Sequence, residues 1–156
     1  MSDPYEELLG GELHLRHAPG ERHERICALL HKTMLASVAN FPGTCLLAPR
    51  TKIQLNAYHA IRPDLSLVTT VNNRLWLAVE VVSSDDHSTD TFLKKQIYED
   101  VKVPRLWMVD PRYDNVEIYH ATEYGLVLKG ILAGDEVLDE PLLPEFQITV
   151  RELFAA

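Results

Sequence analysis

The stretch Leu75–Val82 reads LWLAVEVV, an apolar run with one carboxylate, Glu80, inside it. A short continuous apolar run of this kind is typical of a buried β-strand. Upstream, Arg62–Val68 reads RPDLSLV and opens a second apolar run with Asp64 directly after a proline. Ionised carboxylates are rarely kept in a core unless a cation pairs with them or a metal binds. Two acids on neighbouring core strands therefore indicate a built anionic site.

Length and composition are those of a soluble globular protein. The chain has 156 residues, of which 46% are hydrophobic and 24% charged, so we expect a single domain over residues 1–156. No apolar stretch reaches the length of a membrane span, and the acidic N-terminus lacks the layout of a secretory signal. Cys27 and Cys45 are too few for a disulfide framework. We therefore expect a cytoplasmic protein that is not bound to a membrane.

The net charge of −8 argues against broad, nonspecific binding to polyanions, which favours clustered basic residues. A local basic cleft is still compatible with that charge. The basic residues that could gather around one cleft are Arg16, Arg22, Arg25, Arg50, Lys52, Arg62 and Lys94.

Hydrophobic spacing divides the chain into helices and short strands. From Gly20 to about Asn40 the apolar residues recur at helical spacing, and Pro42-Gly43 ends the pattern. A second helix is predicted from about Ser88 to Val101. Strands are predicted at Glu12–Arg16, Thr44–Leu47, Lys52–Leu55, Asp64–Thr69, Leu75–Val82 and Arg105–Pro111.

The C-terminal third favours a hairpin. Val116–Tyr119 and Tyr124–Leu132 read as antiparallel strands, and Ile148–Phe154 as either a strand or a short terminal helix. Val71–Arg74 predicts a hairpin turn between two of the earlier strands. Helix, strands, helix and strand in this order predict an α/β fold with a mixed sheet.

The pair Asp64 and Glu80 has two interpretations. If their strands are adjacent and antiparallel, the two carboxylates converge near one end of the sheet, where their repulsion raises a pKa unless a divalent cation lies between them. Oxygen-only ligands suit Mg²⁺ or Mn²⁺ better than Zn²⁺. The alternative is structural, with Asp64 capping a turn and Glu80 facing solvent.

Lys94 adds a basic group to this pair. Asp90, Lys94 and Tyr98 follow one another at four-residue intervals on one side of the second predicted helix. Lys94 borders the apolar stripe of that helix, so its amine can lean over the sheet towards Asp64 and Glu80. The alternative is a surface Asp–Lys pair that contributes about 0.2–0.5 kcal/mol to helix stability.

Four ordered blocks of the sequence carry a family resemblance. They are Pro63-Asp64, Val79–Ser83, Asp90-x-x-x-Lys94-x-x-x-Tyr98 and Val103–Pro111. Together they resemble the Uma-two family of restriction endonucleases, within the PD-(D/E)XK nuclease superfamily. The resemblance extends upstream to Tyr5–Leu13 and His23, and covers roughly Tyr5 to Tyr119.

The resemblance implies a restriction-endonuclease-like core, with a mixed central sheet flanked by helices and an extra antiparallel hairpin. It also implies that Asp64 and Glu80 bind Mg²⁺ or Mn²⁺ and that Lys94 is catalytic, with Glu12 and His23 as secondary candidates. The wider superfamily has a lysine two residues after the glutamate, where this chain has Val82, so Lys94 is its replacement. Residues 84–86, Ser-Asp-Asp, differ from the Ser-Pro-Ser/Thr of the family.

The expected function is therefore that of a metal-dependent endonuclease hydrolysing DNA phosphodiester bonds, as a homodimer. A second interpretation is a catalytically inactive nuclease-fold module that binds or regulates, with subunits pairing through the Tyr113–Leu132 hairpin. A third is a structural dimer in which the acids pair with arginines such as Arg62 or Arg105.

Overall fold

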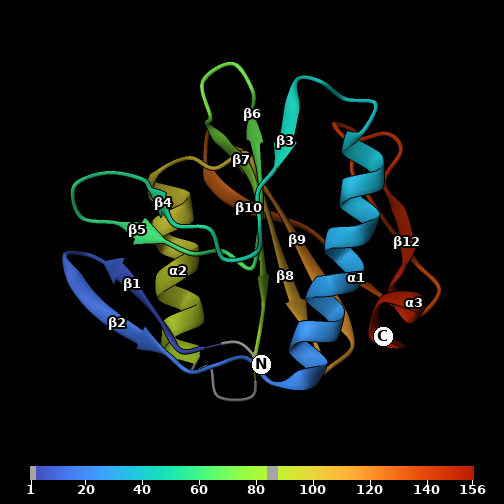
Figure 1. Cartoon of the computed structure of the whole chain (residues 1–156), viewed down its shortest axis with the longest axis horizontal. Helices are drawn as coiled ribbons and strands as arrows, with labels where there is room; N and C mark the ends of the chain where they lie inside the picture. The colour runs from blue at the N-terminus through green and yellow to red at the C-terminus, as the bar shows by residue number, and fades with distance from the viewer. Residues whose placement is uncertain (1–2, 84–87) are drawn as a thin grey trace.

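The centre of the protein is a six-stranded mixed sheet, seen in a computed structural model that describes residues 3–83 and 88–156, with the backbone alone at residues 88–90. The strand order is β10-β9-β8-β7-β6-β3 (Figure 1). β7 and β8 pair in parallel, and the other neighbours pair antiparallel. The strands are β3 (Thr44–Leu46), β6 (Leu65–Thr69), β7 (Leu75–Val81), β8 (Arg105–Asp110), β9 (Asn115–Thr122) and β10 (Gly125–Ala133).

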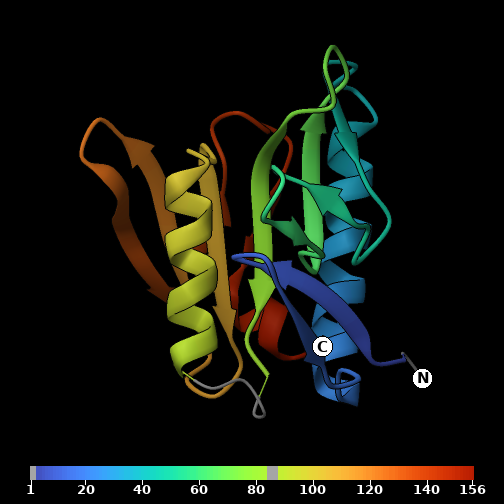
Figure 2. The same ribbon diagram turned by 90° about the vertical axis from the view of Figure 1, so that its left-hand side faces the viewer.

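Helices cover both faces of this sheet. α1 (Glu21–Val38) and the short α3 (Val150–Phe154) lie on one face, beside a two-stranded sheet of β11 (Val137–Asp139) and β12 (Gln147–Thr149). α2 (Ser88–Asp100) lies on the other face with a four-stranded sheet in the order β2-β1-β5-β4, which Figure 2 shows in front of the central sheet. The strands of the small sheet are β1 (Tyr5–Leu9), β2 (Glu12–Arg16), β4 (Ile53–Gln54) and β5 (Ala60–Ile61).

The apolar run at Leu75–Val82 is explained by burial on both faces of β7. Leu77 and Val79 belong to the core beneath α1, whereas Ala78 and Val82 belong to the core beneath α2. A strand covered on both faces reads as a continuous hydrophobic run rather than an alternating one. Glu80 is therefore placed on the α2 face by the same alternation that buries Ala78 and Val82.

The predicted α/β architecture with a mixed sheet is confirmed, and so is the antiparallel hairpin, which β9 and β10 form. The tail uses both predicted alternatives, because β12 runs directly into α3. The strands β1, β5 and β11 were not predicted. Among the described residues, no helix is both long enough and apolar enough to cross a bilayer.

Candidate functional site

A polar cavity of about 170 Å³ lies at the end of the sheet where β7 ends and β6 begins. Leu65 pairs with Val79 across these strands, so the next positions outward bring Asp64 opposite Glu80. Both acids line the cavity, as do Lys94 and His23. The cavity therefore draws side chains from α1, from α2 and from the sheet between them.

Glu80 lies on the α2 side of the cavity and is only 9% exposed. Its Oε1 lies 2.7 Å from the Lys94 Nζ and accepts a hydrogen bond of 2.5 Å from the Tyr98 hydroxyl. Burial raises the pKa of Glu80 to about 7, with the charges of Glu7 and Asp64 adding to the effect and the Lys94 ammonium opposing it. A carboxyl group with such a pKa exchanges its proton near neutral pH, as acid–base and metal sites often require.

Lys94 is held between two carboxylates. Its ammonium donates to both oxygens of Glu7, at 3.1 and 3.0 Å, in addition to its contact with Glu80. Burial alone would lower the pKa of Lys94, but the charges of Glu80 and Glu7 raise it above its ordinary value. The amine is therefore a charged group with a fixed position, not a flexible surface lysine.

Glu7 comes from β1 and is almost fully buried. Besides Lys94, it accepts hydrogen bonds from the Arg16 Nε at 2.9 Å and the Arg62 backbone amide at 2.8 Å. Burial by itself would raise the pKa of Glu7, but Lys94 and the Arg62 amide hold it below its ordinary value. Because buried charges are tolerated when they are paired and hydrogen-bonded, Glu7 acts as the ionised anchor of the Lys94 ammonium.

Asp64 takes most of its partners from the other side of the sheet. Its Oδ1 lies 3.1 Å from the Arg50 guanidinium, and its Oδ2 accepts from the Val81 amide at 2.8 Å and lies 3.4 Å from the His23 Nε2. Burial would raise the pKa of Asp64, but the hydrogen bond and charge of His23, the Val81 amide and Lys94 lower it. Asp64 is thus ionised at neutral pH, unlike Glu80, which titrates there.

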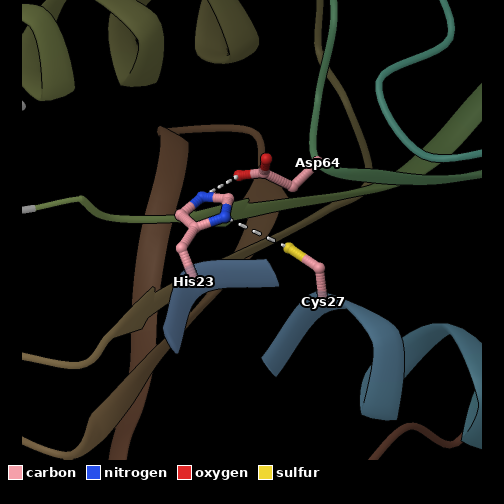
Figure 3. Close-up of side chains that lie close together, drawn as sticks. All are labelled: His23, Cys27 and Asp64. Atoms are coloured by element: carbon pink, nitrogen blue, oxygen red, sulfur yellow. Dashed lines mark hydrogen bonds and ion pairs between the residues drawn. The ribbon is translucent and has the colours of Figure 1, made fainter. Parts of the chain in front are cut away.

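His23 and Cys27 lie beside Asp64 on consecutive turns of α1 (Figure 3). The His23 ring contacts the Val81 carbonyl through Nε2 at 2.9 Å and the Cys27 sulfur through Nδ1 at 3.6 Å. The line Cys27–His23–Asp64 resembles a nucleophile–base–acid arrangement. Burial and the Asp64 charge raise the pKa of the Cys27 thiol, and Cys27 is only 3% exposed and does not line the cavity. A reactive thiolate needs the opposite environment, so Cys27 is not a nucleophile.

The structure thus places Asp64, Glu80, Lys94 and His23 around one cavity, but not Glu12. The Glu12 side chain is 84% exposed on β2, with His14 at 4.0 Å, and does not line the cavity. The acid of the N-terminal hairpin that contacts the site is Glu7, through Lys94. Its alternation with buried Leu9 on β1 is the sequence signal that identifies it, and that signal was missed because no strand was predicted there.

The arginines suggested as partners of the acids have other contacts. Arg105 pairs with Glu140 at 2.7 Å, and the Arg62 guanidinium donates to the Arg50 carbonyl. Arg50 is the partner of Asp64 instead. The Ser84–Asp86 departure from the family pattern and the Asp90 side chain lie outside the described residues.

Only some of the arginines and lysines that were predicted to gather around one cleft lie near the cavity. Arg16 and Lys94 line the cavity, and Arg50 reaches it through Asp64. Arg22 pairs instead with Asp114, 2.8 Å away. Each of the three cations near the cavity already contacts a carboxylate, so the site is close to charge balance in the absence of a metal.

The sequence profile of the family described as "Uma2: Putative restriction endonuclease" matches residues 2–151. No curated protein matches the chain. Among solved structures, the chain is similar to a "putative nuclease belonging to DUF820" from Anabaena variabilis, with a TM-score of 0.82 and 15% sequence identity, over 99% of this chain and 92% of that one. At this identity the structural likeness supports the fold.

Proposed function

Because the chain belongs to the Uma2 family, we propose that it is a metal-dependent endonuclease that hydrolyses DNA phosphodiester bonds. The observation that carries the proposal is the convergence of Asp64, Glu80 and the buried Lys94 on one cavity. Two carboxylates can hold a divalent ion that activates water and neutralises charge on a phosphate, and a fixed ammonium can stabilise the negative charge that develops. The family description supplies DNA as the polymer.

The donor set around Asp64 and Glu80 fits Mg²⁺ or Mn²⁺. Both contacts of Glu80 engage Oε1, and within the described ranges its Oε2 accepts no hydrogen bond. Carboxylate oxygens are the preferred ligands of these ions. When bound, Mg²⁺ or Mn²⁺ would neutralise charge on the scissile phosphate and lower the pKa of a coordinated water.

Lys94 has a separate role in this proposal. Its ammonium stays protonated because Glu7 and Glu80 stabilise its charge, so it acts as a fixed positive point charge next to the cavity. A preorganised charge of this kind stabilises negative charge that develops in a transition state, without the cost of reorienting at the moment of reaction. Glu7 is a positioning residue, because it holds the amine and does not line the cavity.

In this proposal the divalent ion also contributes to DNA binding. Glu7, Asp64 and Glu80 already occupy Lys94, Arg16 and Arg50, and the whole chain carries a net charge of −8. Among the described residues, the basic side chains at the cavity therefore offer little unpaired positive charge to a phosphate. A bound dication supplies it at the place where hydrolysis occurs.

The alternative proposal, an inactive binding or regulatory module, is supported by the same pairing. Asp64 and Lys94 each satisfy their charge within the protein, as members of a purely structural network do. This alternative predicts an intact fold and no divalent ion between the acids.

We also propose that the protein forms a homodimer through the edge strand β10. Val127, Leu128 and Ile131 are 37%, 43% and 50% exposed there, and β10 ends the central sheet. A long apolar edge strand invites pairing with another strand. Light scattering on the purified protein should give twice the monomer mass, whereas the Leu128→Lys variant should give the monomer mass.

Cleavage of DNA separates the two functional proposals. Duplex, branched and single-stranded DNA are each incubated with the protein and Mg²⁺ or Mn²⁺, and in parallel reactions a chelator is present. We expect cleavage of at least one substrate that the chelator abolishes and that the Asp64→Asn/Glu80→Gln variant lacks. The matched control carries the same chemical changes at exposed acids, Asp139→Asn/Glu123→Gln, and should cleave normally. Equal cleavage by both variants would refute the assignment of the site.

A further inference from the structure

The proposed function does not use Cys27, although this residue belongs to a compact group of metal-ligand types. His23, Cys27 and Asp64 are all buried, and one potential ligand atom from each lies within 4.8 Å of the other two (Figure 3). The group offers a nitrogen, a sulfur and an oxygen. Mg²⁺ and Mn²⁺ prefer oxygen, whereas mixed nitrogen, sulfur and carboxylate ligands suit Zn²⁺ and its neighbours in the first transition series.

We infer that His23, Cys27 and Asp64 form a binding site for a divalent transition metal of the Zn²⁺ class, separate from the Mg²⁺ or Mn²⁺ proposed between Asp64 and Glu80. Two of the three ligands, His23 and Cys27, come from consecutive turns of one helix at positions i and i+4, which places them on the same face. The third approaches from the start of β6. A rigid helix and a buried strand therefore position the whole set.

The hydrogen bonds of His23 select the ring nitrogen that binds the metal. Nε2 lies 2.9 Å from the Val81 carbonyl and 3.4 Å from the Asp64 Oδ2, both of which are acceptors, so Nε2 carries a proton and Nδ1 is the ring nitrogen that can bind a metal. Ligand histidines characteristically donate their second N–H to a backbone carbonyl or a carboxylate in this way. The Val81 carbonyl thus already provides the outer partner of a metal-bound imidazole.

The separation of nitrogen and sulfur matches tetrahedral coordination. Zn–N and Zn–S bonds of about 2.0 and 2.3 Å at a tetrahedral angle place the two ligand atoms about 3.5 Å apart. The measured distance between His23 Nδ1 and Cys27 Sγ is 3.6 Å. These two ligands therefore need no rearrangement. The Asp64 Oδ2 lies 3.4 Å from the other ring nitrogen, Nε2, so the carboxylate would have to turn towards Nδ1 and Sγ to complete the set, within a group whose ligand atoms span at most 4.8 Å. The fourth position is left for water from the cavity, which Asp64 and His23 line.

The neighbouring charges accommodate a dication. Arg50 lies 3.1 Å from Asp64 and 2.7 Å from Glu24, so the loaded site contains one guanidinium and one dication. The thiolate of Cys27 and the carboxylates of Asp64 and Glu24 balance these three positive charges. The thiol is neutral without metal, because burial raises its pKa, and binding therefore displaces one proton to solvent.

A functional consequence follows if the proposed function holds. Asp64 is shared between the two sites, so a zinc-class metal on His23 and Cys27 withdraws an oxygen ligand from the Mg²⁺ or Mn²⁺ that supports cleavage. Such a metal would be an inhibitor of the nuclease, acting from the α1 side of the cavity.

The binding site is tested with Co²⁺ as a spectroscopic probe of the full chain under reducing conditions. We expect one equivalent of Co²⁺ to produce a thiolate-to-metal charge-transfer band and the d–d absorption of a tetrahedral ion. Cys27→Ser and Cys27→Ala should lose the charge-transfer band, and Cys45→Ser should keep it, because Cys45 is the exposed cysteine. Absence of the band in the unmodified protein, or its persistence in both Cys27 variants, would overturn the inference.

A second measurement requires no variant. X-ray absorption at the zinc edge of the unmodified protein should show one sulfur and a shell of nitrogen and oxygen ligands. A shell without sulfur would overturn the assignment.

In cleavage assays, one equivalent of Zn²⁺ should inhibit the unmodified protein far more than Cys27→Ser. Equal inhibition would refute the shared ligand, whereas a protein with the cobalt band and no cleavage under any condition would refute the proposed function alone.

Discussion

Replacing Glu80 by glutamine should make the protein more stable at neutral and alkaline pH while it abolishes cleavage. Glu80 is buried among like charges from Glu7 and Asp64, which together with burial raise its pKa from 4.5 to about 7. Glutamine has nearly the same shape and cannot ionise. The variant therefore keeps the packing next to Tyr98 but loses both the cost of a buried carboxylate and a metal ligand.

The sign and size of the effect follow from proton linkage. Below about pH 4.5 the carboxyl group is protonated in both the folded and the unfolded chain, so ionisation costs nothing. As the pH rises towards 7, the unfolded chain releases this proton first, and the wild-type fold loses stability relative to the variant. With pKa values of 4.5 and about 7, the free energy of unfolding of Glu80→Gln relative to wild type should rise by about 2.5 kcal/mol between about pH 5 and about pH 8.

Urea denaturation at the two pH values measures this change directly, because any pH-independent effect of the substitution cancels between them. Glu12→Gln is the matched control, since its side chain is 84% exposed, and its difference from wild type should be the same at both pH values. If Glu80→Gln also shows the same difference at both, the pKa of Glu80 is not raised and the reasoning about its burial is wrong.

Three further predictions concern the groups around Glu80. Lys94→Ala should reduce kcat more than it weakens Mg²⁺ binding, and it should lower the free energy of unfolding by about 3–5 kcal/mol, because two buried carboxylates lose their cation. The control Lys95→Ala should do neither, because the Lys95 amine contacts Tyr119 instead. Cleavage by Lys94→Ala at the rate of the unmodified protein would refute the role of Lys94. Glu7→Gln should also destabilise the fold by about 3–5 kcal/mol and slow turnover. The control Glu6→Gln, at an exposed position, should change the free energy of unfolding by less than about 0.5 kcal/mol. Equal melting curves for the two variants would contradict the anchoring role of Glu7. In a filter-binding assay, DNA should bind weakly to the protein in the presence of a chelator and tightly in the presence of Ca²⁺. An affinity for DNA that does not depend on the metal would show that the protein attracts phosphate by itself.

Local patterns in the sequence predict the central fold well. Leu75–Val82 reads as a strand buried on both faces, and β7 is such a strand. The helical spacing after Gly20 and the spacing after Ser88 predict α1 and α2 to within a few residues. These elements owe their identity to their own periodicity, so no knowledge of their neighbours is needed to find them.

The small sheet and the contacts of the site depend on residues far apart in the chain. Glu7 meets Lys94 across 87 positions of sequence, and no local pattern encodes such a contact. Arg50 reaches Asp64 from a loop in which its own φ is +56°, a conformation that few non-glycine residues adopt. Asp64, Glu80 and Lys94 could be singled out from local patterns because Glu80 and Lys94 lie on well-defined elements and Asp64 directly precedes β6. Glu7, Arg50 and Cys27 could not, because their contacts arise only when those elements pack.

The measurement that tests the central proposal most directly is calorimetric titration of the protein with Mn²⁺. The proposal predicts binding to the unmodified chain that is lost in Asp64→Asn and in Glu80→Gln and retained in Asp139→Asn. Undiminished binding in both site variants, or no binding to the unmodified chain, would contradict a divalent ion shared by these two carboxylates.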